Sequence, residues 1–349
     1  MSGADDLPGL PAEPAARWLR GALPGGPSGP WSAELISGGL SNLTYRTRLG
    51  AERLVIRRPP LGPALPRAHD MHREYRVLTG LGPTPVPVPE VLGFCSDTSV
   101  IGAPFYVMRE VPGLVVRTPD DAARLSADQR QRLSEHLVDV LADLHAVDPY
   151  AAGLADFGRH GGYADRQLST WSRQWERSRT RQLPDMDRLI ARLGERLPRG
   201  GETTLVHGDY RLDNTVVETE PAARVAAVLD WELATLGDPV ADLATLLTYW
   251  HDADDEERDL IAVARGLTTF PGFPTTRDLT ELYATRTRRD LSTLTFHRAL
   301  AAMKLGVILE GVHARYLAGK TLGEGYAAAG TAVPVLAARG LRLLAAPNR

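Results

Sequence analysis

The sequence predicts an α+β fold in which the strands come first along the chain and most helices follow. Between residues 31 and 111, short apolar or alternating runs are separated by glycine and proline turns, a pattern typical of strands, and one helical stretch interrupts them at His69–Leu81. After residue 112, apolar residues recur at helical spacing, most clearly in Gln129–His145. We therefore expect a small part built on an antiparallel sheet and a larger, mostly helical part.

Three segments follow from this pattern. Residues 1–30 are rich in proline, glycine and alanine and are predicted to be an N-terminal extension. The first lobe is predicted over residues 31–111 and the second over residues 112–349, because Pro112-Gly113 turns the chain after the last strand-like run.

The composition is that of a folded protein with no electrostatic preference for nucleic acid. Of the 349 residues 43% are hydrophobic and 24% are charged, with a formal net charge of −3. Among the 40 basic residues only Lys304 and Lys320 are lysine, so a phosphate-binding cation in the N-terminal half must be arginine or histidine. Cys95 is the single cysteine and cannot form an intrachain disulfide. The first ten residues lack the apolar core of a signal peptide and no run is long enough to span a membrane, so we expect a cytoplasmic protein.

The most informative stretch is Leu205–Asn214, in which His207-Gly208-Asp209 is followed five positions later by Asn214. A second apolar run, beginning at Val225, ends on Asp230. Phosphoryl transfer needs a carboxylate to accept the proton of the attacking hydroxyl, and an amide and a second carboxylate to hold Mg2+. The His-x-Asp-x4-Asn spacing is that of kinase catalytic loops. We therefore predict Asp209 as the catalytic base and Asn214 and Asp230 as Mg2+ ligands, with Glu232 as a possible second metal contact.

A glycine-containing turn between two strand-like runs is a candidate phosphate-binding loop. Paired glycines allow backbone N–H groups to approach phosphate oxygens, although many Gly-Gly turns bind nothing. The candidate nucleotide-binding residues in this turn are Ser37, Gly38, Gly39, Ser41 and Asn42.

An ion pair is predicted between the strand Arg53–Arg58 and the helical stretch that follows it. Kinases place a lysine on this strand, where it contacts the phosphates and pairs with a glutamate on the next helix. Arg57 and Glu74 are the candidates here, the alternative being that Arg57 is an exposed strand arginine.

The end of the strand-rich part is predicted to hold the nucleotide base. Kinases bind the base through backbone groups of the connector between the lobes, which places Glu110 and Val111 in contact with it. Met108 is predicted to line the base pocket, with ordinary core packing as the alternative.

Two features of the helical part have an open role. Asp242, in the second turn of a helix that begins at Asp238-Pro239, is expected to accept hydrogen bonds from the backbone of the catalytic loop. Arg166, Arg173 and Arg177 share one helical face, with Arg181 one turn further on. This face is either a solvated basic surface or a site for an anionic group of a substrate.

Together, Ser37–Asn42, Arg57, Glu74, His207–Asn214, Leu229–Glu232 and Gly237–Leu243 resemble the aminoglycoside phosphotransferase / choline kinase family. The resemblance runs from Trp31 to the C-terminus and is greatest to the phosphotransferase-type domains fused to acyl-CoA dehydrogenases and to their free-standing bacterial relatives. It implies a two-lobed protein-kinase-like fold with a five-stranded sheet and a helix in the first lobe. By position it assigns the roles given above to Asp209, Asn214 and Asp230. Arg57 departs from the family pattern, which has lysine.

The activity that the resemblance implies is that of a small-molecule kinase, which uses ATP or GTP with Mg2+ to phosphorylate a hydroxyl. The arginine face favours an anionic acceptor such as a hydroxy acid or a hydroxyacyl-CoA. The alternatives are an aminoglycoside or other antibiotic as acceptor, and an inactive nucleotide-binding protein, which Arg57 alone favours. A protein kinase is disfavoured by Gly208 and Trp231.

Overall fold

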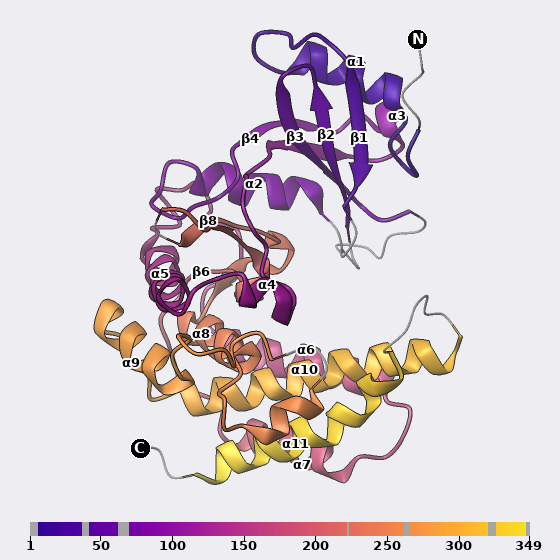
Figure 1. Cartoon of the computed structure of the whole chain (residues 1–349). Helices are drawn as coiled ribbons and strands as arrows, with labels where there is room; N and C mark the ends of the chain where they lie inside the picture. The colour runs from indigo at the N-terminus through magenta and orange to yellow at the C-terminus, as the bar shows by residue number, and fades with distance from the viewer. Residues whose placement is uncertain are drawn as a thin grey trace. The chain divides into compact units, whose positions relative to one another are not determined.

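The computed structural model describes residues 6–36, 42–61, 70–221, 223–261, 266–319 and 326–346 (Figure 1). The chain divides into two compact units. The first comprises Met1–Pro112, Ala152–Leu154 and Ala226–Ala234, and the second comprises Gly113–Ala151, Ala155–Val225 and Thr235–Arg349. The predicted lobes differ from these units in that residues 226–234, which include Asp230, group with the first unit.

The first unit is built on a five-stranded antiparallel sheet with strand order β1-β2-β3-β5-β4 (Figure 1). Its strands are β1 (Trp31–Leu35), β2 (Leu43–Leu49), β3 (Glu52–Arg58), β4 (Val91–Cys95) and β5 (Phe105–Arg109). Its helices are α1 (Ala12–Ala22), α2 (Met71–Leu81) and α3 (Thr98–Ile101). Asp70 is the N-cap of helix α2, because its side chain accepts the N–H of Arg73.

Helix α1 belongs to the core of the first unit, although the sequence led us to describe residues 1–30 as an extension. Leu19 is fully buried together with Leu54 and Phe105 in one apolar cluster, and the ring of Trp18 meets that of Phe105 edge to face at 4.9 Å. Burying an apolar side chain of this size stabilises the folded state by about 1.5–3 kcal/mol. The helix therefore covers apolar surface of the sheet.

The second unit is mostly helical. Its helices are α4 (Pro119–Ala123), α5 (Ala127–Ala146), α6 (Tyr163–Ser178), α7 (Pro184–Glu195), α8 (Pro239–Tyr249), α9 (Thr276–Thr287), α10 (Leu294–Leu317) and α11 (Ala329–Ala345), with short 3-10 turns η3 (Glu256–Leu260) and η4 (Tyr326–Ala328). Helices α6, α7, α10 and α11 enclose one core that contains Trp175, Leu189, Met303 and Leu336. Helix α10 packs along α11, which lies beside it in Figure 1.

Short strands carry the predicted catalytic segments. Strand β6 (Thr204–Val206) pairs with β9 (Thr235–Gly237) and leads directly into His207. The turn η1 (Leu212–Asn214) follows the catalytic loop and leads into β7 (Thr215–Glu218). In β8 (Arg224–Val228) the chain passes into the first unit, and η2 (Trp231–Leu233) begins immediately after Asp230.

Within the described ranges, no helix is both long enough and apolar enough to cross a membrane.

The turn between β2 and β3 depends on Gly50, and this dependence can be measured. Gly50 has φ +61, and a Cβ added to it would collide with the carbonyl oxygen of Ser28. Gly102 has a similar φ of +84, with no atom within 4 Å of an added Cβ. We expect Gly102→Ala to lower the free energy of unfolding by about 1–2 kcal/mol, the cost of the left-handed backbone, and Gly50→Ala to lower it by about 1–3 kcal/mol more. Urea unfolding of both variants measures the difference, and equal losses would show that the Ser28 contact is unimportant.

Candidate active site

The predicted catalytic loop is held through its backbone by one buried carboxylate. Asp242 Oδ2 accepts the N–H of His207 at 2.6 Å, and Oδ1 accepts the N–H of Gly208 at 2.8 Å. Asp242 is 1% exposed. Burial alone would raise its pKa, but the hydrogen bond and charge of His145 and the N–H of Gly208 hold that pKa below its usual range. The prediction that Asp242 braces this loop is confirmed.

The loop backbone is fixed at two further points. His207 is fully buried, and its Nδ1 accepts the N–H of Asp209 at 3.2 Å. Gly208 has φ +84, a left-handed conformation that glycine adopts without steric cost, and its carbonyl oxygen accepts a hydrogen bond from Lys304 Nζ at 2.8 Å. The backbone on both sides of Asp209 is therefore fixed by side chains.

Asp209 is partly accessible, with 24% of its side chain exposed. Asn214 Nδ2 donates to Asp209 Oδ2 at 3.0 Å and to the carbonyl oxygen of Asp209 at 2.9 Å. Arg211 Nε lies 3.3 Å from Asp209 Oδ2 and 3.2 Å from Asp213 Oδ1, and its guanidinium lies over the ring of Tyr249. Because both donations of Asn214 come from its nitrogen, its amide oxygen keeps its capacity to bind a cation.

In the first unit, three carboxylates surround Arg57. Its Nε lies 2.9 Å from Glu74 Oε2, its Nη2 lies 2.6 Å from Asp230 Oδ1, and Glu232 Oε2 is 4.0 Å from Nη2. The side chain of Arg57 is 12% exposed and that of Glu74 is 1% exposed. The predicted Arg57–Glu74 ion pair is present, and the alternative of an exposed strand arginine is wrong. No sequence pattern indicates that Asp230 shares the same guanidinium.

Two neutral side chains complete the cluster around Glu74. Asn42 Nδ2 donates to Glu74 Oε1 at 2.8 Å and to Glu232 Oε2 at 3.2 Å, and Tyr106 OH donates to Glu74 Oε2 at 3.0 Å. Burial, with the charges of Asp230 and Glu232, outweighs Arg57 and Tyr106 and raises the pKa of Glu74 to about 7. Asn42, predicted as part of a phosphate-binding turn, thus bonds two carboxylates, while Ser37, Gly38, Gly39 and Ser41 lie outside the described residues.

Asp230 retains the capacity to bind a cation. It has φ +65, a left-handed conformation that aspartate tolerates better than most residues, and its side chain is 34% exposed. The Arg57 contact uses Oδ1, which leaves the second carboxylate oxygen. No group of three or more histidine, cysteine or acidic side chains suited to a metal occurs among the described residues. Mg2+ commonly needs only one or two protein oxygens when phosphates supply the rest, and the roles of Asn214 and Asp230 as its ligands stay a prediction.

The residues predicted to hold the base lie in β5 or directly after it. Met108 is 7% exposed in the sheet, opposite Val55 and Val91. The Glu110 carboxylate accepts from Arg46 and Arg53, each at 2.7 Å, and the Glu110 N–H donates to the carbonyl oxygen of Arg53. Within the part of the chain that is described, Val111 makes no backbone hydrogen bond. The side chain of Glu110 therefore fixes the strands, while the backbone of Val111 is available to a ligand.

Comparison with known proteins identifies the family. A family model described as the phosphotransferase enzyme family matches residues 32–279. The chain belongs to this family. A solved structure from Ralstonia eutropha JMP134, classed as a candidate aminoglycoside phosphotransferase, is 33% identical with a TM-score of 0.80, covering 95% of this chain and 98% of that one. The predicted family and the two-lobed protein-kinase-like fold are thereby confirmed.

Two further comparisons, one of sequence and one of structure, show how much of each protein is similar to this chain. The mouse protein named acyl-CoA dehydrogenase family member 10 is 38% identical over 317 residues, which cover 89% of this chain and 29% of that protein. The chain thus spans under a third of that relative. A thermostable mutant of aminoglycoside phosphotransferase APH(4)-Ia, in ternary complex with ADP and hygromycin B, has a TM-score of 0.60 at 14% identity, covering 90% of this chain and 95% of that one. This second likeness concerns the fold alone.

At both ends of the arginine face, the side chains make hydrogen bonds or ion pairs within this protein. Arg166 donates to the carbonyl oxygens of Gly161 and Arg159. Arg181 pairs with the buried Glu310 at 3.3 Å and donates to the carbonyl oxygen of Gly330. The two ends of the face therefore have structural partners, which weakens the prediction of an anion site there.

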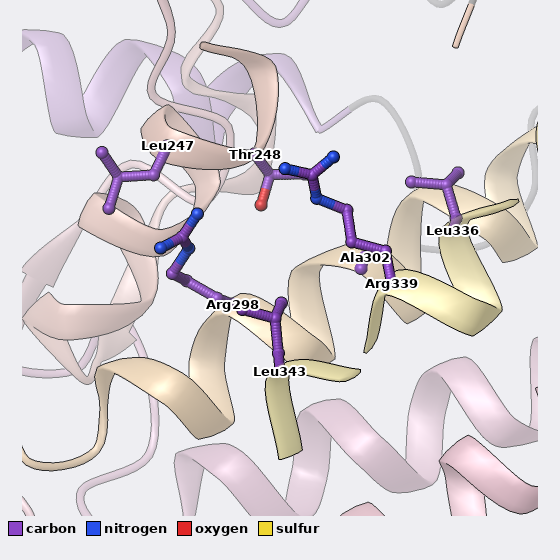
Figure 2. Close-up of a pocket in the computed structure, with 7 residues that line it drawn as sticks. All are labelled: Leu247, Thr248, Arg298, Ala302, Leu336, Arg339 and Leu343. Atoms are coloured by element: carbon purple, nitrogen blue, oxygen red, sulfur yellow. The ribbon is translucent and has the colours of Figure 1, made fainter. Parts of the chain in front are cut away.

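A small pocket of the second unit contains none of the predicted site residues (Figure 2). It is lined by Leu247, Thr248, Arg298, Ala302, Leu336, Arg339 and Leu343. Arg339 is bonded to both oxygens of Asp255, so this arginine is already neutralised by the chain. We assign no part of the phosphotransferase site to this pocket.

Removing the brace of the catalytic loop should destabilise the protein. In Asp242→Ala two buried N–H groups lose their acceptor, each at about 1–3 kcal/mol, so we expect the free energy of unfolding to fall by about 2–6 kcal/mol. Asp120→Ala, which removes an exposed acid in the first turn of α4, should cost less than about 1 kcal/mol. Urea unfolding measures both, and a loss for Asp242→Ala no larger than the control would contradict the bracing role.

The Arg57 cluster should require a guanidinium. Arg57→Met leaves Glu74 and Asp230 without their cation, and we expect a loss of about 3–5 kcal/mol in the free energy of unfolding. Arg57→Lys should be intermediate, since a single ammonium is compact and lacks the two separate nitrogens that face Glu74 and Asp230 here. Arg53→Met, on the same strand but half exposed, should cost about 1 kcal/mol or less. Thermal unfolding of the three variants orders them, and equal stability of Arg57→Met and Arg53→Met would contradict this account.

Proposed function

We propose that the protein is an ATP- or GTP-dependent small-molecule kinase that transfers the γ-phosphate to a hydroxyl, with Asp209 as the catalytic base. The observation that carries the proposal is the braced loop: Asp242 and His207 fix the peptide groups around Asp209, while its carboxylate stays partly exposed and hydrogen-bonded to Asn214. Rigid placement of a carboxylate is what phosphoryl transfer requires, because positioning and electrostatic stabilisation supply most of the rate enhancement.

In this proposal Asp209 accepts a hydrogen bond from the attacking hydroxyl and takes its proton as the oxygen–phosphorus bond forms. The nucleoside diphosphate leaves with the electron pair of the broken bond. Asn214 and Asp230 are the proposed ligands of Mg2+, which, when bound, supplies positive charge to the phosphate oxygens. Their fit rests on the amide oxygen that Asn214 retains and on the second oxygen of Asp230.

The nucleotide is proposed to bind through the first unit. Arg57 replaces the usual lysine, and its contacts with Glu74 and Asp230 place a cation beside a proposed Mg2+ ligand. Val111 is proposed to bind the base through its backbone, next to Met108 and Glu110. The turn that includes Ser37, Gly38, Gly39 and Ser41 remains the proposed phosphate loop on sequence grounds. The ADP in the APH(4)-Ia complex supports ATP as donor, with GTP as the alternative.

For the acceptor we propose a hydroxy acid or a hydroxyacyl-CoA. The names of the curated relatives, acyl-CoA dehydrogenase family members, support an acyl-CoA, and Arg211 and Lys304 place positive charge near Asp209. An aminoglycoside is the second candidate, favoured by the hygromycin B bound to the APH(4)-Ia mutant. The same phosphorylation assay with both acceptor classes distinguishes them, since turnover of aminoglycosides alone would remove the first candidate.

The role of Asp209 has a direct test. We expect Asp209→Ala to lower turnover by about 100- to 10,000-fold, the usual contribution of a positioned general base, while leaving nucleotide affinity nearly unchanged. Asp128→Ala removes an exposed carboxylate in the first turn of α5 and should leave both quantities unchanged. Nucleoside diphosphate release measures turnover and isothermal calorimetry measures affinity. Turnover of Asp209→Ala within about threefold of the parent protein would remove Asp209 as the base.

A further inference from the structure

Lys304 is a lysine in an otherwise arginine-rich chain, and it lies next to the proposed catalytic residue. It projects from α10, and its Nζ donates to the carbonyl oxygen of Gly208, the residue before Asp209, at 2.8 Å. The same ammonium lies 5.5 Å from the centre of the Trp171 ring on α6. Helix, aromatic ring and catalytic loop thus come together at one charged group.

The hydrogen bonding of this ammonium is incomplete. An ammonium carries three N–H donors, and among the described residues Lys304 uses one of them. Burial lowers the pKa of Lys304. The charges of Asp209 and Asp242 raise that pKa, and the charge of Arg211 lowers it further, so the net shift is downward. A partly desolvated cation with spare donors gains stability from an acceptor atom brought to it.

Bracing of the loop accounts for one N–H donor of Lys304 and leaves the other two unexplained. The N–H groups of His207 and Gly208 already have Asp242 as acceptor, and the N–H of Asp209 has His207. Partial burial of a lysine ammonium costs desolvation free energy. A neutral donor would satisfy the Gly208 carbonyl oxygen without that cost, so this one hydrogen bond does not explain a lysine at this position.

We propose that Lys304 recognises the acceptor: its remaining N–H donors bind a carbonyl or carboxylate oxygen that lies close to the reacting hydroxyl, and Trp171 forms the flat apolar wall beside that part of the molecule. This inference rests on the proposed function, in which Asp209 takes the proton of the hydroxyl. It makes Lys304 a specificity-determining residue for acceptors that carry an anionic or carbonyl group.

The charges around Asp209 agree with this class of acceptor. Arg211 contacts the Asp209 carboxylate, and Lys304 is close enough for the two groups to influence one another electrostatically. A polycationic acceptor would meet two like charges at this carboxylate, whereas a hydroxy acid or its thioester would meet two opposite ones or hydrogen-bond donors.

The test compares acceptors that differ only in the recognised group. The probes are straight-chain hydroxy acids of four to eight carbons, their CoA thioesters, and diols of the same length, each titrated calorimetrically into the full chain. We expect the parent protein to bind acids or thioesters at least about 10-fold more tightly than the matched diols. Lys304→Met should lose about 10- to 100-fold in affinity for the acids or thioesters and little for the diols.

A conservative variant and a pH series separate recognition from a structural effect. Lys304→Arg keeps the charge and should restore preference for the acid or thioester, while Lys304→Met should keep its melting temperature and ATP affinity. The charged form of Lys304 exists below its pKa, which is lowered, so acceptor affinity of the parent should fall as pH rises through that pKa. In Lys304→Arg the affinity should stay constant, because arginine does not deprotonate there.

The outcomes distinguish this inference from the proposed function. Equal affinities of the parent and Lys304→Met for acids and thioesters, or no binding of any of them by the parent, would overturn the role of Lys304. Where binding behaves as expected but the parent protein phosphorylates no probe with ATP or GTP, the acceptor inference stands and the proposed kinase activity fails. Parallel kinetics should show the Lys304→Met effect in KM more than in kcat.

Discussion

The hydrogen bonds from two consecutive peptide N–H groups to Asp242 are the interaction on which the site in the second unit depends. They cost the burial of a full carboxylate charge, and they offset that cost because each bond is charge-assisted and His145 lies within 3.4 Å. A loop held only by water would leave Asp209 free to sample many positions. With both preceding N–H groups bound to one rigid helix residue, the position of the Asp209 main chain follows from that of α8.

In the first unit, one cation, Arg57, contacts two carboxylates, whereas in the second unit one carboxylate accepts two peptide N–H groups. Glu74 is almost fully buried and Asp230 is 34% exposed, and one cation contacts both carboxylates. A guanidinium can do this because Nε and Nη2 point to different carboxylates, whereas an ammonium is a single compact charge. The replacement of the usual family lysine by Arg57 therefore has a structural reason in this chain, and it does not by itself indicate an inactive protein.

Motifs with fixed spacing were predictable from the sequence, and contacts between distant segments were not. The loop with Asp209 and Asn214, the Asp238-Pro239 start of α8 and the Arg57–Glu74 pair each follow from local rules. In contrast, Lys304 lies 96 residues from the Gly208 carbonyl that it contacts, and Glu310 lies 130 residues from Thr180, whose N–H it accepts beside Arg181. Helical periodicity places arginines on one face but cannot name the carboxylate or carbonyl opposite them. For the same reason the sequence does not predict that α1 buries one face against the sheet of the first unit.

The charges around Arg57 and around Asp209 indicate which ligands each group of residues would favour. Around Arg57, three carboxylates gather at one guanidinium, and burial, reinforced by the charges of Asp230 and Glu232, raises the pKa of Glu74. Such a site gains from an added divalent cation, as a Mg-nucleotide would supply. Around Asp209 the charges are more evenly matched, since Arg211 lies beside both Asp209 and Asp213 and Lys304 adds a second cation. Under the proposed function, an acceptor that brings a hydroxyl to Asp209 together with negative charge or carbonyl oxygens would therefore meet Arg211 and Lys304 as opposite charges or donors.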